Sequence, residues 1–508
     1  MEQALNSYIV IEPFELERLQ ELKIDKRMNE HVKLTFKGIV PESRKDSYVQ
    51  MADAQTEIVV KEVDEQGKKV TLFHGMILDV EIQMVQGVYF ISVTAMSNTY
   101  KLDLQPVDRS FQQIGLAYSS LMKKIIGAYP QADLIDYASN GSSLESMILQ
   151  YQESDWQLLK RLASHFHTGV VPAAMDERTL CYFGLPQLGG KGKLTVHNYR
   201  VQKRMDLYQQ ALSARIPGVS QHDFVFYEVE SPQVLDVGHE VEFNGKKLLV
   251  SQVGMVLEQG VLKRRYILAR EGGLVIPKQY NKTIVGASVQ GQVLAVSKDR
   301  VKVHLNMDSA QDEGTACWLP YSTIYASADN AGWYFMPEQG DNVRIYFPTH
   351  EEKDAFATSS VAKAGGSGGG ASGGGAAGGG SGAAGGSGVG AGAGTGAGGS
   401  GGSAGAGCGD PMQDPEIKTL KTKNGKMIVL APDYIMISGD GVSILLEDEN
   451  GITLTSSKDI KVTAAENVIL QSKNITLAAS EKVEMSCKDS SLVIENDVVL
   501  KGNQVRNN

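Results

Sequence analysis

The chain has 508 residues, 42% of them hydrophobic, which is enough for several domains with buried cores. The formal net charge of −10 at pH 7 argues against a general nucleic-acid-binding protein, which would present a basic surface. The beginning of the sequence lacks the basic-then-apolar pattern of a signal peptide, and no apolar run is long enough to span a membrane. We therefore expect a protein that is made and assembled in the cytoplasm without a signal peptide.

The cysteines predict reduced thiols. They are far apart in the sequence and none has CxxC spacing. Such cysteines in a cytoplasmic protein are more often free than joined in disulfides or bound to zinc. They are Cys181, Cys317, Cys408 and Cys487.

Residues 1–109 are predicted to form a first small β-barrel. Extended segments are expected at 14–24, 32–40 and 88–95. The sequence DEQGK at 64–68 separates two further strand candidates and is typical of a hairpin turn.

Residues 110–191 are predicted to be the helical part of the chain. Ser110 could cap a helix that ends at Ile126, and apolar residues recur at helical spacing over 144–151. The S-x-x-Q sequence at 154–157 has the form of a capping box, which predicts that a helix begins there. The residues expected to be buried around this helix are Trp156, Leu159, Leu162, Ala163 and Phe166.

Residues 192–275 are predicted to form a second barrel, in which Asn244-Gly245 is a type I′ hairpin turn. The two strand-rich segments have dissimilar sequences but similar element content. If three copies of such a chain associate, six similar units surround the axis. That arrangement would suit a hexameric partner.

Residues 276–358 are predicted to form an OB-type barrel. OB folds often bind oligonucleotides in a basic groove with stacking aromatic residues. Between positions 281 and 350, however, seven acidic residues outnumber five basic ones. We therefore interpret this barrel as a structural adaptor that binds no nucleic acid. Its expected packing residues are Trp333, Tyr334, Phe335 and Pro337.

Residues 359–414 are rich in glycine, alanine and serine. Such a segment cannot bury enough apolar surface to offset its ordering entropy, which predicts a flexible linker. The G-x-S-x-G pattern at 365–369 lies inside this tract. No strand or helix is predicted there that would hold a nucleophilic serine, so composition explains the pattern.

Residues 415–508 contain a repeat of about eight residues, each unit carrying two apolar residues two positions apart. Positions i and i+2 of a strand face the same side, so each unit is one short strand with a two-residue apolar face. One such strand cannot bury its face, which favours three chains braided into a trimeric β-helix. A β-sandwich with regular strands is the alternative. The expected core residues of the trimer are Ile444, Leu446, Ile452, Leu454, Ile460, Val462, Val468, Leu470, Ile475, Leu477, Val483 and Met485.

The sequence predicts no catalytic residue, no cofactor and no bound metal. His165 and His167 are two apart near a helix end, where their side chains point in different directions. Four ligands are typical of a zinc site, and no third ligand stands nearby.

Three stretches resemble the VgrG and phage central-spike proteins of contractile injection machines. They are QYQESDWQLLKRLA at 150–163, GWYFMPEQGDNVRIYFP at 332–348 and KTLKTKNGKMIVLAPDYIMI at 418–437. The resemblance is closest to Gram-positive phage tails and phage-tail-like bacteriocins. It implies a mainly β, multidomain fold: two hub β-barrels with an α-containing segment between them, an OB-type barrel, and a C-terminal intertwined trimeric β-helix.

The resemblance also implies partners. The hub would be a homotrimer on which hexameric tube protein stacks, and it would contact baseplate proteins. A PAAR-type tip protein would dock near Val505, Arg506, Asn507 and Asn508. Sheath contraction would drive the spike through the target cell envelope, so the chain would function in an extracellular or injected, virion-like particle.

Two alternatives from other functional classes remain. A cell-wall hydrolase on a β-helical stalk would need acid/base residues such as Glu145, Glu153 or Asp155, of which the last two are better explained as helix N-terminal charges. An adhesin would need an aromatic-rich tip, which the end of the sequence lacks. Some phage spikes carry a lysozyme domain where this chain has only residues 359–414, so we expect no enzyme activity.

Overall fold

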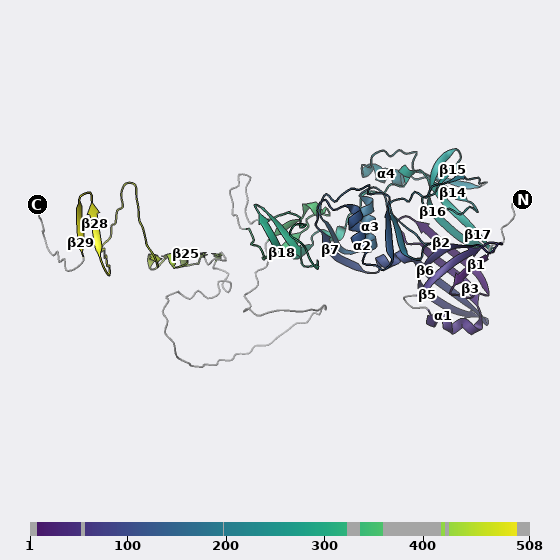
Figure 1. Cartoon of the computed structure of the whole chain (residues 1–508), viewed down its shortest axis with the longest axis horizontal. Helices are drawn as coiled ribbons and strands as arrows, with labels where there is room; N and C mark the ends of the chain where they lie inside the picture. The colour runs from purple at the N-terminus through teal and green to yellow at the C-terminus, as the bar shows by residue number, and fades with distance from the viewer. Residues whose placement is uncertain are drawn as a thin grey trace. The chain divides into compact units, whose positions relative to one another are not determined.

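The computed structural model describes residues 8–51, 56–196, 198–322, 336–358, 418–421 and 426–494 (Figure 1). The chain divides into two units, Met1–Ala362 and Lys363–Asn508. The whole predicted linker at 359–414 lies outside the described residues, as do the predicted tip residues Val505 to Asn508 and the predicted packing residues Trp333, Tyr334 and Phe335.

Within the described part of the first unit, twelve strands form one sheet with two similar halves (Figure 1). The first half has the order β1-β4-β5-β6-β3-β2 and the second the order β12-β15-β16-β17-β14-β13. The strands of the first half are β1 (Tyr8–Glu12), β2 (Arg18–Arg27), β3 (Lys33–Val40), β4 (Glu57–Val63), β5 (Lys69–Val85) and β6 (Val88–Ser97). Those of the second are β12 (Gly190–Lys193), β13 (Tyr199–Lys203), β14 (Val225–Glu230), β15 (Glu240–Phe243), β16 (Lys246–Glu258) and β17 (Val261–Ala269).

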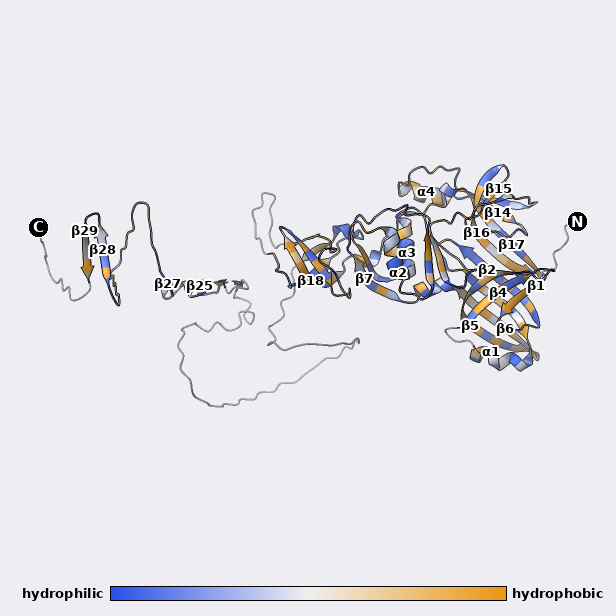
Figure 2. Ribbon diagram, viewed as in Figure 1, coloured by the Kyte–Doolittle hydropathy of each residue, from blue (hydrophilic) through white to orange (hydrophobic). Residues whose placement is uncertain are grey.

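The two halves are joined because β2 pairs antiparallel with β16. Buried and less buried residues alternate along strands such as β3, as expected when one face of a sheet covers a core. Figure 2 shows the corresponding mixture of apolar and polar residues along these strands. One hydrophobic core runs through both halves and includes Leu22 and Ile24 of the first and Val253 and Met255 of the second.

Two predicted hairpins are confirmed. The Asp64 carboxylate accepts hydrogen bonds from the backbone N–H groups of Gln66 and Lys68, between β4 and β5. Asn244 and Gly245 have φ of 50° and 67°, the left-handed values of a type I′ turn, between β15 and β16.

Between the two halves of the sheet lies a segment of mixed structure. It contains β7 (Pro106–Phe111), α2 (Tyr118–Ile126), β8 (Ala132–Asp136), β9 (Ile148–Ser154), α3 (Asp155–Ser164), β10 (Val170–Pro172) and β11 (Thr179–Phe183). Two other helices belong to the halves of the sheet themselves: α1 (Lys45–Met51) lies between β3 and β4 in the sequence, and α4 (Met205–Ser213) lies between β13 and β14. The short 3-10 helices are η1 (Glu42–Arg44), η2 (Asn98–Asp103), η3 (Glu271–Gly273), η4 (Lys282–Ile284) and η5 (Glu352–Asp354).

Two helical predictions for this segment are wrong. Ser110 lies in β7, where its N–H and hydroxyl both donate to the Asp308 carboxylate, and the helix begins only at Tyr118. Residues 148–151 belong to β9, which pairs with β7. The apolar run there is buried on both faces of a strand, a pattern that periodicity alone does not distinguish from a helix.

The capping box of α3 is confirmed. Ser154 Oγ accepts from Gln157 N, and Gln157 Oε1 accepts from Ser154 N. Trp156 is buried, as expected, together with Leu159 and Leu162.

The OB-type barrel is built from β18 (Ser288–Ser297), β19 (Arg300–Leu305), β20 (Leu319–Pro320), β21 (Asn342–Tyr346) and β22 (Phe356–Thr358). Their order is β20-β19-β18-β21-β22, and a bridge between Tyr321 and Ala357 brings the two edges together. The barrel core also receives Met147 and Leu149 from the preceding segment.

The described part of the second unit is also made of strands. β23 to β27 form an antiparallel sheet in chain order, and β28 pairs with β29. The strands are β23 (Lys418–Lys421), β24 (Met427–Leu430), β25 (Tyr434–Gly439), β26 (Val442–Glu447), β27 (Gly451–Ser456), β28 (Val483–Cys487) and β29 (Ser490–Ile494). The predicted strand units between positions 460 and 477 are described, but they form no strand in the single chain.

Candidate assembly surfaces

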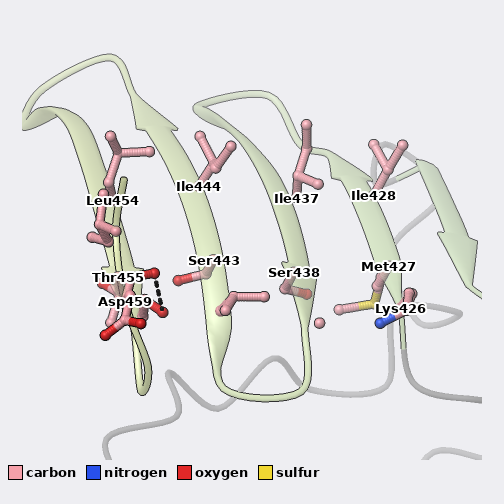
Figure 3. Close-up of a pocket in the computed structure, with 14 residues that line it drawn as sticks. Lys426, Met427, Ile428, Ile437, Ser438, Ser443, Ile444, Leu454, Thr455 and Asp459 are labelled. Carbon is pink, nitrogen blue, oxygen red and sulfur yellow. Dashed lines mark hydrogen bonds between the residues drawn. The ribbon is translucent and has the colours of Figure 1, made fainter. Parts of the chain in front are cut away.

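The sheet of the second unit carries two rows of apolar side chains on one face. Antiparallel register places Ile428 opposite Ile437, Ile437 opposite Ile444, and Ile444 opposite Leu454. Figure 3 shows these four side chains lined up along one side of the strands. The second row, two residues along each strand, consists of Leu430, Ile435, Leu446 and Ile452.

Both rows are open to solvent in the single chain. Every member of the rows is more than a third exposed, and Ile452 reaches 71%. Complete burial of such a side chain is worth ~1.5–3 kcal/mol, so covering each half-exposed one would contribute roughly 1 kcal/mol. In the described residues of this unit no hydrophobic core cluster forms, and the sheet only borders a hollow of about 590 Å³.

The remaining predicted trimer-core residues are also largely exposed. Ile460, Val462, Val468, Leu470, Ile475 and Leu477 are each more than half exposed. Met485 lies exposed in β28, and Val483 is half-buried. Among the described residues, these apolar pairs of the repeat are therefore left uncovered within one chain.

Two of the three carboxylates weighed for catalysis, Glu153 and Asp155, are engaged in ion pairs. Arg161 is buried and binds Glu153 through Nε and Nη2 at 2.9 Å each, and Glu352 through Nη1 at 2.7 Å. Asp155 pairs with Arg109 and accepts from the Tyr129 hydroxyl at 2.8 Å. These contacts connect α3 to neighbouring strands and, through Glu352 of η5, to the OB-type barrel.

Burial and the charges around α3 shift the pKa of a neighbouring tyrosine, Tyr129. Burial, followed by the hydrogen bond to Asp155, raises the pKa of Tyr129. Glu145, the third carboxylate considered for catalysis, is exposed.

The sequence did not predict the ion pair between Arg161 and Glu352, because the two residues are 191 positions apart.

The two candidate histidines point to different neighbours. Tyr118 Oη lies 2.8 Å from His165 Nδ1, and burial lowers the pKa of His165 to about 3. His167 Nδ1 lies 3.3 Å from the Ile276 carbonyl oxygen. Across the described residues, no group of three or more His, Cys, Asp or Glu side chains could hold a metal ion.

Two of the cysteines, Cys181 and Cys317, are free and buried, and burial raises their thiol pKa to about 12 and about 11. Pro337, one of the predicted packing residues of the OB-type barrel, is half-buried. No described helix has the length and apolar character needed to cross a membrane.

The elements above define a mainly β, multidomain protein with a two-part sheet, an OB-type barrel and a strand-repeat unit. Residues 289–361 match the family of the type VI secretion system/phage-baseplate injector OB domain. The OB-type barrel of this chain is therefore similar to that injector domain, and the fold of the chain is similar to that of VgrG proteins, as the sequence resemblance predicted.

Two solved structures support the similarity of the fold to that of VgrG proteins. The lidded PdpA–VgrG complex of Francisella contains a chain that is 10% identical, with a TM-score of 0.52, over 90% of this chain and 81% of that chain. The half-lidded complex gives 9% identity and a TM-score of 0.51 over 89% of this chain and 88% of that chain. A comparison with curated protein sequences found no match.

A further solved structure is the E. coli c3393 protein, described as a type VI secretion component with structural similarity to the T4 tail proteins gp27 and gp5. It is 12% identical, with a TM-score of 0.48, over 69% of this chain and 99% of that chain.

Proposed function

We propose that the chain is the homotrimeric hub and spike at the tip of the inner tube of a contractile injection machine. The observation that carries the proposal is the two-row apolar face of β24–β27, which a single chain leaves exposed. The fold of the VgrG proteins and the injector-family OB domain support the same role.

In this function the spike works mechanically. Three copies of the strand-repeat unit would bury their apolar rows against one another, so that each chain supplies one side of a needle. Interwoven strands leave few free edges and let axial load spread over many hydrogen bonds between chains. Because the apolar faces are covered only after association, the stability of this unit depends on protein concentration.

The proposal includes partners and location. The hub would carry hexameric tube protein and contact baseplate proteins, and a PAAR-type tip protein would dock on Val505 to Asn508. After assembly in the cytoplasm, the particle would pierce the target cell envelope on sheath contraction. We assign no enzymatic step, and the ion pairs of Glu153 and Asp155 support this assignment.

The mass of the full chain in solution tests the proposal. Mass photometry should give a particle near 164.4 kDa, three times the chain mass of 54.8 kDa. A chain that stays monomeric at micromolar concentration in sedimentation velocity would refute the assignment.

A pair of matched variants tests the role of the apolar face. The double variant Ile444→Asp/Leu454→Asp places carboxylates on opposed residues of the apolar rows and should raise the dissociation constant of the trimer at least tenfold. The control is Ser443→Asp/Thr455→Asp, which changes two opposed residues on the other face of the same strands. An equal effect of both variants would show that the apolar rows are not the buried face.

A further inference from the structure

The five strands of the OB-type barrel, β18 to β22, contain no acidic residue, although the sequence around them is acidic. Between positions 281 and 350, seven acidic residues outnumber five basic ones. The described acidic residues of this stretch lie in the turns and loops between the strands, at Asp299, Asp308, Asp312, Glu313, Glu338 and Asp341. The charge summed over the sequence therefore does not describe the charge on the strands.

Several of these loop carboxylates are already held by neighbouring groups. Asp308 accepts hydrogen bonds from the N–H and the hydroxyl of a serine in β7. Asp312 and Asp341 each accept a hydrogen bond from a backbone N–H group of their own loop. Among the described residues, neither Arg300 of β19 nor Arg344 of β21 forms an ion pair. The two guanidinium groups therefore keep their charge available on the barrel surface.

The outward side chains of β18 form a track without charge that has cations on both sides. β18 is the central strand of the barrel sheet, with β19 on one side and β21 on the other. We define the β18 track as the outward residues Gln290, Gln292, Ala295 and Ser297. Residues that are directly opposite in antiparallel strands lie on the same face of a sheet. The residues opposite the track are Arg344 for Gln290, both His304 and Asn342 for Gln292, Lys302 for Ala295, and Arg300 for Ser297.

The cations follow the track at short and regular intervals. Outward positions of a strand recur about every 7 Å, so the four positions of the track span about 20 Å. Three of the four positions have a Lys or Arg directly opposite. A linear polymer with closely and evenly spaced negative charges could therefore lie along β18 and meet one cation after another.

The side chains along the track suit hydroxyl groups better than nucleobases. OB folds bind oligonucleotides or oligosaccharides on this part of the barrel, and bases require aromatic rings on which to stack. No Phe, Tyr or Trp lies in the track or directly opposite it. Trp318, which precedes β20, is 38% exposed, but the Lys302 ammonium lies 5.0 Å from the centre of its ring. The amides of Gln290 and Asn342 are exposed and can both donate to and accept from a hydroxyl group.

We propose that the β18 track binds a linear polyol phosphate, a phosphodiester chain with free hydroxyl groups and no bases. Arg300 and Arg344 bind phosphate oxygens at the two ends of the track, because a guanidinium group presents paired donors that fit a phosphate. Lys302 donates to the Glu313 carbonyl oxygen at 2.6 Å and keeps two further donors for a phosphate between them. The amides of the track bind the hydroxyl groups.

This binding is separate from the mechanical role of the spike. All of the residues involved lie in one barrel of one chain, so binding requires no second copy. It would give the particle affinity for an anionic polymer in addition to the ability to pierce an envelope.

Isothermal titration calorimetry of the full-length protein with poly(glycerol phosphate) tests the proposal. Binding should be measurable at low ionic strength and should weaken as salt is added, because salt screens exposed charges. The double variant Arg300→Gln/Arg344→Gln should raise the dissociation constant about tenfold or more.

The matched control is Lys282→Gln/Lys353→Gln. It removes the same charge from exposed residues of η4 and η5, outside the five strands. Its dissociation constant should stay within about twofold of the parent value. Melting curves of both double variants show that the barrel remains folded.

Two further polymers test the chemistry of the ligand. Oligothymidylate carries phosphates together with bases, and hyaluronate carries carboxylates without phosphates. Both should bind more weakly than poly(glycerol phosphate). Tighter binding of oligothymidylate would overturn the proposal in favour of a nucleic-acid site, and tighter binding of hyaluronate would overturn the preference for phosphate.

The remaining outcomes also decide the question. No heat of binding with poly(glycerol phosphate) at low ionic strength overturns the proposal, and an equal loss in both double variants overturns the position of the site. The mass of the same samples is measured in parallel. A trimer that binds no polymer leaves the proposed function intact, whereas a monomer that binds it overturns the proposed function alone.

Discussion

Replacement of Arg161 by methionine is expected to destabilise the first unit more than any other single change around α3. The guanidinium is buried, and its side chain holds two carboxylates whose side chains are only 9% and 10% exposed. Arg161→Met removes the charge but keeps an unbranched apolar side chain about as long as the aliphatic stem of arginine. Glu153 and Glu352 are then left buried without a counter-charge, and the Leu149 carbonyl loses a donor.

The loss of the counter-charge to Glu153 and Glu352 sets the expected decrease in the free energy of unfolding. Removing one partner of a buried ion pair costs about 3–5 kcal/mol, chiefly because the remaining charge is uncompensated. For a unit of this size a change of 1 kcal/mol moves the midpoint by about 2 °C or less, so the melting temperature should fall by up to about 6–10 °C. If the uncompensated charge is the cause, adding Glu153→Gln and Glu352→Gln to Arg161→Met should restore much of the loss.

Thermal unfolding followed by tryptophan fluorescence measures this effect, because Trp156 is buried and lies in α3, the helix that carries Arg161. The matched control is Glu351→Gln, which removes a more exposed neighbouring carboxylate whose partner Lys278 is 3.7 Å away. Its expected cost is below about 1 kcal/mol. The reasoning fails if Arg161→Met melts within 1 °C of the parent, or if the triple variant is less stable than Arg161→Met alone.

Two further predictions concern the same helix. Ser154→Ala removes the N-cap of α3 and the hydrogen bond to Asp103. It should lower the free energy of unfolding in denaturant by about 1–2 kcal/mol, and Gln157→Ala should lower it by less. A larger loss for Gln157→Ala than for Ser154→Ala would contradict the capping argument. Burial, together with nearby cations, lowers the pKa of His165 to about 3 from 6.5, so between these values the unfolded chain binds more protons than the folded one. The free energy of unfolding should therefore fall as pH is lowered from 6.5 towards 3, and urea titrations should show a smaller fall for His165→Gln; identical pH profiles would exclude this contribution.

The sequence correctly predicted the turns and helix ends that a few neighbouring residues determine. The hairpin at Asn244-Gly245 and the helix start at Ser154 each depend on a few adjacent residues, and both are confirmed. The order of barrels was expected from the family resemblance, and the OB domain match and the fold comparison support that resemblance.

Contacts between residues far apart in the sequence explain why the helix predicted to start at Ser110 is wrong. Ser110 has the side chain of a helix cap, but Asp308 of the OB-type barrel binds its N–H and hydroxyl while β7 pairs with β9. Neither partner is near it in the sequence. For the same reason no sequence pattern predicted that β2 would join β16, or that Glu352 would complete the charge network of Arg161.

The two units differ in how far a single chain buries their apolar side chains, and this difference predicts an order for the proposed assembly. The first unit seals one continuous core across both halves of its sheet, so it has the interior that a single chain needs to fold. The described part of the second unit has no such core, and its apolar rows are exposed in the single chain. In the proposed trimer the first unit would therefore fold before the spike forms, because only the stability of the spike would depend on the protein concentration. Within the proposed trimer, association of the folded first units would hold three repeat units close together, and the raised effective concentration would favour their braiding.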